Sequence, residues 1–177
     1  LMIFSFTMLS PIIVSSIYGE STSSTFLIAF AITLLAGLVF WLPAMREKSE
    51  LRTRDGFFVT VFFWLVLSAF GALPLWLSDA LQLSFIDSLF ESISGLTTTG
   101  ATVISGLDTL PKSILFYRQQ LQWLGGIGIV VIAVAILPML GIGGMQMYRA
   151  ETPGPLKDSK LTPRIAETAN VLFKIYL

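Results

Sequence analysis

The sequence contains four long stretches without a charged residue, and each predicts a helix that crosses a membrane. About 20 apolar residues in a helix span the hydrocarbon core of a bilayer. A signal peptide is the alternative for the first stretch, but this stretch has neither a basic start nor an A-x-A cleavage site. We therefore expect an all-α integral membrane protein with multiple spans. The stretches are Leu1–Gly19, Ser21–Met45, Gly56–Ser78 and Gln119–Tyr148.

A short amphipathic segment between the third and fourth stretches predicts a loop that re-enters the membrane. Apolar residues recur at helical spacing from Phe85 to Leu96, which gives about three turns and is too short to cross a bilayer. The polar segment Thr97–Thr102 follows. Non-helical backbone at membrane depth must be buried in protein or line a watery path. The segment is therefore interpreted as a pore loop, with a simple turn between two spans as the alternative.

The residues of this loop suit a cation. We expect an extended strand here, because extended backbone can point successive carbonyl oxygens into a pore, where these carbonyls and threonine hydroxyls replace the hydration shell of an ion. Gly100 permits backbone angles that are closed to other residues, and the C-terminus of the short helix carries negative partial charge. Five acids lie in the segments expected outside, against Lys112 and Arg118, and this excess would concentrate cations at the mouth. They are Glu20, Asp79, Asp87, Glu91 and Asp108.

These acids also have structural interpretations. For Asp79 and Asp108, ordinary solvated loop charges are the favoured interpretation. Asp87 and Glu91 lie one helical turn apart on the short helix. Pairing of these two with the backbone or with Arg118 is favoured over ion binding.

Composition narrows the function further. Of 177 residues, 54% are hydrophobic and 12% are charged, and the net charge is zero. A soluble domain carries about a quarter charged residues, and nucleic-acid binding needs a basic excess that is missing here. The chain has no cysteine and no histidine, which removes zinc motifs and Ser-His-Asp triads. We expect no enzyme and no cofactor.

The basic residues predict the orientation. They cluster between the second and third stretches (Arg46–Arg54) and after the fourth (Arg149–Arg164). Loops rich in Lys and Arg stay in the cytoplasm, so the N-terminus is expected inside. The last residues, Thr162–Leu177, have the pattern of a helix that is still incomplete, which indicates a piece of a longer protein.

Glycine and proline interrupt the fourth stretch. They form either a helix-packing surface or a hinge. A broken helix of this kind would also suit the alternative function, an ion-coupled (H⁺ or Na⁺) secondary transporter. The residues are Gly125, Gly126, Gly128, Pro138, Gly141, Gly143 and Gly144.

Three motifs together resemble a known family. TTTGAT, RQQLQWLGGIGI and GIGGMQMYRAE are similar to the TrkH family, the membrane subunits of bacterial Trk potassium uptake systems within the TrkH/KtrB superfamily. The close match covers Phe57–Leu177. The resemblance implies potassium uptake across the inner membrane through a channel-like pore, built from four helix–pore-loop–helix units with pseudo-fourfold symmetry.

The resemblance also implies a division of the chain and its site residues. Residues 1–55 would be a preceding helix pair and cytoplasmic loop, 56–150 the first helix–pore-loop–helix unit, and 151–177 a linker and the start of the second. The filter glycine corresponds to Gly100. Carbonyls of Thr97, Thr98 and Thr99 would bind K⁺, with Thr98 and Thr99 as the main ligands. A homodimer and a nucleotide-binding regulatory ring, TrkA, are the implied partners.

Overall fold

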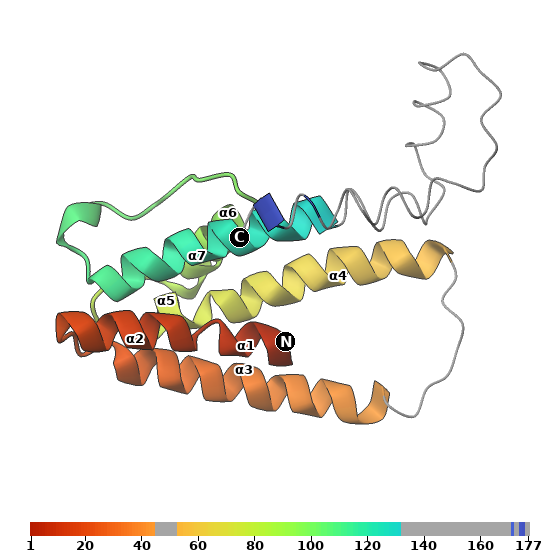
Figure 1. The fold of residues 1–177 in the computed structure, drawn as a ribbon, viewed down its shortest axis with the longest axis horizontal. Coiled ribbons are helices and arrows are strands. Elements are labelled where there is room, and N and C mark those ends of the chain that lie inside the picture. The colour runs from red at the N-terminus through yellow and green to blue at the C-terminus, as the bar shows by residue number, and fades with distance from the viewer. Residues whose placement is uncertain (45–52, 132–170, 172–173, 176–177) are drawn as a thin grey trace, which may run out of the picture. The chain divides into compact units, whose positions relative to one another are not determined.

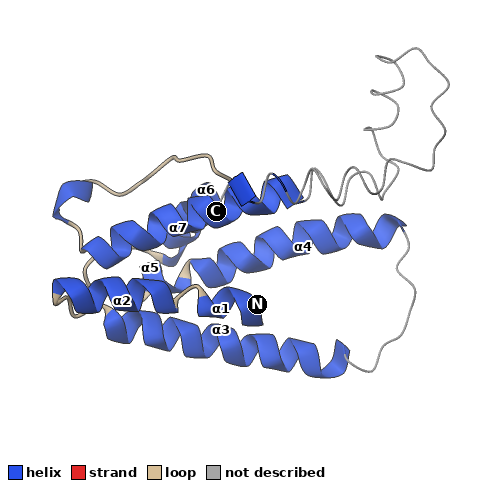
Figure 2. Ribbon diagram, in the orientation of Figure 1, coloured by secondary structure: helices blue, strands red, loops and turns tan. Residues whose placement is uncertain are grey.

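All regular secondary structure in the described part of the chain is helical. The computed structural model describes residues 1–44, 53–131, 171, 174 and 175, and no strand occurs among them (Figure 2). Residues Leu1–Trp123 form one compact unit, and the following account concerns that unit and the remainder of its last helix. The elements are α1 (Met2–Phe6), α2 (Leu9–Tyr18), α3 (Ser23–Ala44), α4 (Thr53–Gly71), α5 (Leu73–Trp76), α6 (Phe85–Leu96), the short 3₁₀ turn η1 (Leu107–Thr109) and α7 (Lys112–Val131).

The first apolar stretch is two helices, α1 and α2, where the sequence predicted one. The helix is interrupted one turn before Pro11. Proline lacks an N–H, and its ring clashes with the carbonyl four residues earlier, which here is that of Thr7. The freed Thr7 carbonyl accepts hydrogen bonds from Ser10 Oγ (2.8 Å) and Gln120 Nε2 (3.0 Å). Both segments of the stretch pack against α3 (Figure 1).

The second stretch gives the longest helix and the third is again divided by a proline. Within the described residues, Ser23–Leu42 of α3 is the one helix long and apolar enough to cross a membrane. The third stretch forms α4 and then the short α5, which begins at Leu73 with Pro74 in its first turn. The sequence predicted one helix over Gly56–Ser78. Pro74 explains the break for the same steric reason as Pro11.

The short helix α6 has the bounds that the sequence predicted, Phe85–Leu96. Its start is fixed by Ser84, whose hydroxyl accepts the N–H of Asp87 (3.1 Å) and donates to the Asp87 carboxylate (2.7 Å). This is an N-cap in which the side chain satisfies one of the unpaired donors of the first turn. The negative Asp87 also lies at the helix end where a carboxylate is favourable.

The buried face of α6 is its polar face. Ser88 and Ser92 are fully buried, whereas Ile86 is 76% and Phe90 42% exposed. Small residues let helix backbones approach closely, and α6 packs on α4 through this side. A Cβ atom added at Gly95 would lie 3.0 Å from the Cβ of Leu121 in α7. Four large apolar side chains of α6 are therefore exposed on the other side, whereas Leu96 is buried; the four are Phe85, Ile86, Phe90 and Ile93.

Tyr117 anchors α7 at the centre of the unit. Its side chain is fully buried, and its ring meets that of Phe26 in α3 edge to face with centroids 5.4 Å apart. The Tyr117 hydroxyl donates to the carbonyl of Gly71 at the end of α4 (2.9 Å). Buried tyrosine needs such a partner for its hydroxyl. These contacts fix the helix that faces α6 and its following loop.

Candidate functional site

The residues predicted to bind the ion form a tight turn at the C-terminus of α6. The N–H groups of Thr98 and Thr99 donate to the carbonyls of Gly95 and Ser94, both at 2.9 Å. This is the Schellman pattern, in which the two bonds close a helix end around a residue in the left-handed conformation. The N–H of Gly100 also reaches the Ser94 carbonyl (3.3 Å). Each of these donors therefore points back into α6.

The turn differs from the extended strand that the sequence analysis expected. Thr98 has φ 56° and Gly100 has φ 75°, so both lie in the left-handed region. The last carbonyls of a helix lack partners within the helix, and the N–H groups of the following residues supply them here. A β-branched residue is uncommon in this conformation, so Thr98 is a strained position held by its surroundings.

The carbonyl oxygens of the turn have no hydrogen-bond partner among the described residues. They are those of Thr97, Thr98, Thr99 and Gly100, and all four residues are exposed. The Thr97 hydroxyl donates to the carbonyl of Ile93 (2.8 Å) and lies 2.8 Å from the hydroxyl of Thr99. The Thr97 proton is thus engaged, and Thr99 donates to it. The turn therefore offers carbonyl and hydroxyl oxygens, which are hard ligands for a cation.

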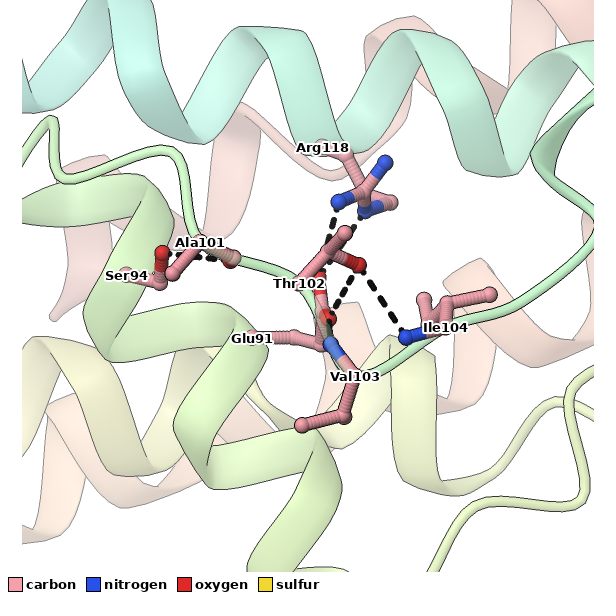
Figure 3. A network of polar contacts seen from close by, with 7 residues as sticks. All are labelled: Glu91, Ser94, Ala101, Thr102, Val103, Ile104 and Arg118. Carbon is pink, nitrogen blue, oxygen red and sulfur yellow. Dashed lines mark hydrogen bonds and ion pairs between the residues drawn. The ribbon is translucent and has the colours of Figure 1, made fainter.

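A second set of bonds holds the chain directly after the turn (Figure 3). Ser94 Oγ donates to the carbonyl of Ala101 (2.6 Å). Glu91 Oε1 accepts the Thr102 hydroxyl (2.6 Å) and the Val103 N–H (2.7 Å). The other carboxylate oxygen of Glu91 accepts Arg118 Nε (3.1 Å) and Nη2 (2.9 Å) from α7. The pairing of Glu91 with both the backbone and Arg118 is confirmed.

Glu20 has a structural role that the sequence did not reveal. Its carboxylate accepts the N–H groups of Lys112 (2.6 Å) and Ser113 (3.1 Å) and the Ser113 hydroxyl (2.6 Å). Burial raises the pKa of Glu20, but these hydrogen bonds and the Lys112 charge outweigh it, so the net pKa is lowered. Glu20 therefore caps α7 and is not a freely solvated charge.

The remaining acids fit solvated loop positions. Asp79 and Asp108 are exposed, and the Asp87 carboxylate accepts the hydroxyl of Ser84, the N-cap residue of its helix. Within the described residues, no group of three or more His, Cys, Asp or Glu side chains gathers as a metal site.

Part of the fourth stretch lies outside the described residues. The structure follows α7 to Val131, so Gly125, Gly126 and Gly128 stand within a helix. Pro138, the later glycines and most of the expected helix Thr162–Leu177 fall beyond it. The predicted break that would favour an ion-coupled transporter is therefore not among the described elements.

Comparison with known proteins gives a consistent picture. A family model described as "TrkH: Cation transport protein" matches residues 22–177. The Trk system potassium uptake protein TrkH of Halomonas elongata is 60% identical over 176 residues, which is 99% of this chain and 36% of that protein. The Trk system potassium uptake protein TrkG of Escherichia coli K12 is 48% identical over 174 residues, or 98% of this chain and 36% of that protein.

A solved structure agrees with this relationship. The crystal structure of the potassium transporter TrkH from Vibrio parahaemolyticus matches with a TM-score of 0.80 and 51% sequence identity. The match covers 99% of this chain and 34% of that one. The chain thus spans only a minor part of the length of the proteins it resembles.

Proposed function

Because the chain belongs to the TrkH family of cation transport proteins, we propose that it is part of a potassium uptake protein and that potassium passes the turn Thr97–Gly100. The relatives are named potassium uptake proteins. Each is far longer than this chain, so transport would be an activity of the whole protein to which these residues contribute. No covalent chemistry is involved, and K⁺ is the transported ion.

The observation that carries this proposal is the division of the turn into donors and acceptors. The N–H groups of Thr97–Gly100 donate into the end of α6, while their carbonyl oxygens accept no bond from the described residues. Carbonyls that are free and close together can replace water around a potassium ion. The C-terminus of α6, with its negative partial charge, lies at the same place. Thr98 and Thr99 are the proposed main ligands.

The turn is exposed on one side, so it supplies only part of an ion's coordination shell. We propose that residues 56–150 form one helix–pore-loop–helix unit, that residues 1–55 precede it as a helix pair, and that 151–177 lead into a second unit. Three further loops from the longer protein would complete the ring. The coverage of 36% of the relatives' length supports this arrangement.

The setting of the protein follows from the same reasoning. We place it in the bacterial inner membrane with a cytoplasmic N-terminus, since α3 can cross a membrane and the basic segments flank the spans on one side. The relatives are named as members of a Trk system. A homodimer that binds a cytoplasmic nucleotide-binding regulatory subunit, TrkA-like, is the proposed assembly.

Substitution of Gly100 tests the proposal. Gly100 has φ 75°, which valine rarely adopts, so Gly100→Val should turn the neighbouring carbonyls away from the ion. We expect potassium uptake in liposomes containing the intact transporter to fall, or its preference over sodium to drop, by about tenfold or more. Gly106→Val is the matched control, because Gly106 also has positive φ (71°) in the same loop but lies beyond the turn. Potassium uptake and potassium-over-sodium selectivity that both stay unchanged in Gly100→Val would refute the proposed site.

A further inference from the structure

We propose that Glu91 is a positioning residue for potassium selectivity, because its carboxylate fixes the chain just beyond the ion-binding turn. This inference rests on the proposed function of that turn. Glu91 touches none of the residues Thr97–Gly100 by hydrogen bond. It acts on the following residues, Thr102 and Val103, and so determines where the turn ends and how its carbonyls are held.

The two oxygens of the Glu91 carboxylate have separate partners (Figure 3). Oε2 accepts both nitrogens of the Arg118 fork, at 3.1 Å and 2.9 Å. Oε1 accepts the Thr102 hydroxyl and the Val103 N–H, at 2.6 Å and 2.7 Å. Hydrogen bonds to an ionised acceptor are short and strong. The carboxylate therefore joins α6, α7 and the loop in one place.

Burial makes this junction rigid. The Glu91 side chain is 2% exposed and that of Arg118 is 12% exposed. A buried carboxylate must keep its counter-charge and fill its remaining lone pairs, because an unpaired buried charge is strongly unfavourable. Movement of Val103 away from Glu91 would leave Oε1 short of donors. The loop is thus held by the same requirement that keeps the ion pair together.

Hydrogen bonds to α6 hold both the turn and the chain directly after it. Within the turn, the N–H groups of Thr98–Gly100 donate to carbonyls at the end of α6. After it, the Ala101 carbonyl is tied to Ser94 Oγ, and the next two residues to Glu91. Among the described residues, every hydrogen bond that joins residues 97–103 to a helix ends on α6. The carbonyls without a partner among the described residues, those of Thr97–Gly100, precede the segment that Ser94 and Glu91 bind.

A purely structural ion pair would not need this arrangement. Arg118 and one carboxylate oxygen suffice to join two helices. The second oxygen instead binds the loop, and Thr102 in turn receives the N–H of Ile104 on its hydroxyl (3.1 Å). Selectivity in a carbonyl filter depends on how its oxygens are held around the ion. Loss of the hydrogen bonds between Glu91 and the loop should therefore lower the potassium preference while the protein still folds.

Thr102→Val is the decisive variant, because it removes the hydroxyl donor and leaves the Glu91–Arg118 pair intact. In liposomes with the intact transporter, we expect its potassium-to-sodium flux ratio to fall about three- to tenfold through loss of one charge-assisted hydrogen bond. Thr102→Ser restores the hydroxyl and should restore the ratio. Thr109→Val is the matched control, since that hydroxyl bonds only within its own loop, to the Gly106 carbonyl (2.8 Å).

Glu91→Gln gives a second measurement. Glutamine keeps the shape of the side chain, but its amide has one acceptor oxygen and a donor NH₂ group in place of the second carboxylate oxygen. We expect a larger drop in the flux ratio than for Thr102→Val; if this variant does not fold, Thr102→Val alone decides. A parent-like ratio in Thr102→Val would overturn the role of Glu91, provided that the parent itself selects potassium. A parent transporter without selective potassium flux would instead refute the proposed function and, with it, this inference.

Discussion

Helices α2 and α6 end in the same hydrogen-bonded turn, but with different residues at its left-handed position. After α2, the N–H groups of Gly19 and Glu20 donate to the carbonyls of Ser16 and Ser15, and Gly19 has φ 66°. After α6, Thr98 and Thr99 make the equivalent bonds, and Thr98 has φ 56°. Both turns are Schellman motifs, yet one has glycine and the other threonine at the position where a side chain is disfavoured.

The two turns also hold their following chain in the same way. Ser15 Oγ donates to the carbonyl of Glu20 (3.0 Å), and Ser94 Oγ donates to that of Ala101 (2.6 Å). After the first turn, the acid Glu20 caps α7. In the second turn, the carbonyls of Thr97–Gly100 have no partners among the described residues. Strained conformations persist where the surroundings hold them, and they cluster at functional sites. The difference marks the α6 turn as the specialised one.

Removal of Arg118 should disturb the α6 turn most and leave the α2 turn intact. Arg118→Met would leave Glu91 as a buried, unpaired charge, so the free energy of unfolding should fall by about 3–5 kcal/mol. Thermal unfolding in detergent measures this, with Gln119→Met on the same helix as control, because Gln119 is exposed. Amide hydrogen exchange should quicken at Thr98 and Thr99 but not at Glu20. Equal exchange at the two turns would show that the ion pair does not hold the loop.

Exchange of the two left-handed residues tests whether threonine is tolerated or required. Gly19→Thr should lower the free energy of unfolding by about 1–2 kcal/mol from backbone strain alone, because no atom lies within 4 Å of the added Cβ. Thr98→Gly should release part of the same strain and leave stability equal or raised by up to about 1 kcal/mol.

The decisive test of this exchange measures both the free energy of unfolding and the potassium preference of each variant. Thr98→Gly should lower potassium preference in liposome flux even where the protein is more stable, since the freed backbone no longer fixes its carbonyl. Gly19→Thr should change stability alone. A Thr98→Gly protein that is less stable and equally selective would remove the distinction between the two turns.

The smallest effect is expected at Glu20, whose interaction is with a partly exposed helix end. A charge at a helix N-terminus contributes about 0.3–1 kcal/mol, so Glu20→Gln should lower the free energy of unfolding by that amount at neutral pH. The folded-state pKa of Glu20 lies below its ordinary value of 4.5. The contribution is therefore complete above that value and lost as the pH falls through the lowered one.

Unfolding measured at a series of pH values should show the two proteins converging on the acid side of 4.5. Asp108→Asn is the control, because Asp108 is exposed and lies in the loop that precedes α7. A difference between the parent and Glu20→Gln that stays constant down to strongly acid pH would mean that the carboxylate does not cap α7 as an anion.

Local patterns in the sequence were sufficient for much of the fold. The spacing of apolar residues gave α6 its bounds, and the threonine and glycine residues after it marked where the helix ends, but not the left-handed turn that they form. The motifs of that turn and of α7 identified the family. The breaks at Pro11 and Pro74 were also present as signals, since proline excludes the helix one turn before it, but they were outweighed by the length of the apolar stretches.

What the sequence determined by itself was which residues share a face, a turn or a charge-free stretch, because these depend on neighbours within a few positions. Only the tertiary structure decided that the small polar face of α6 is buried and that the apolar face is exposed. It also joined Glu20 to the start of α7 and Glu91 to Val103 and Arg118. The periodicity of a sequence predicts which residues share one face of a helix, but not which other helix packs against that face. Contacts between distant segments depend on how whole helices pack.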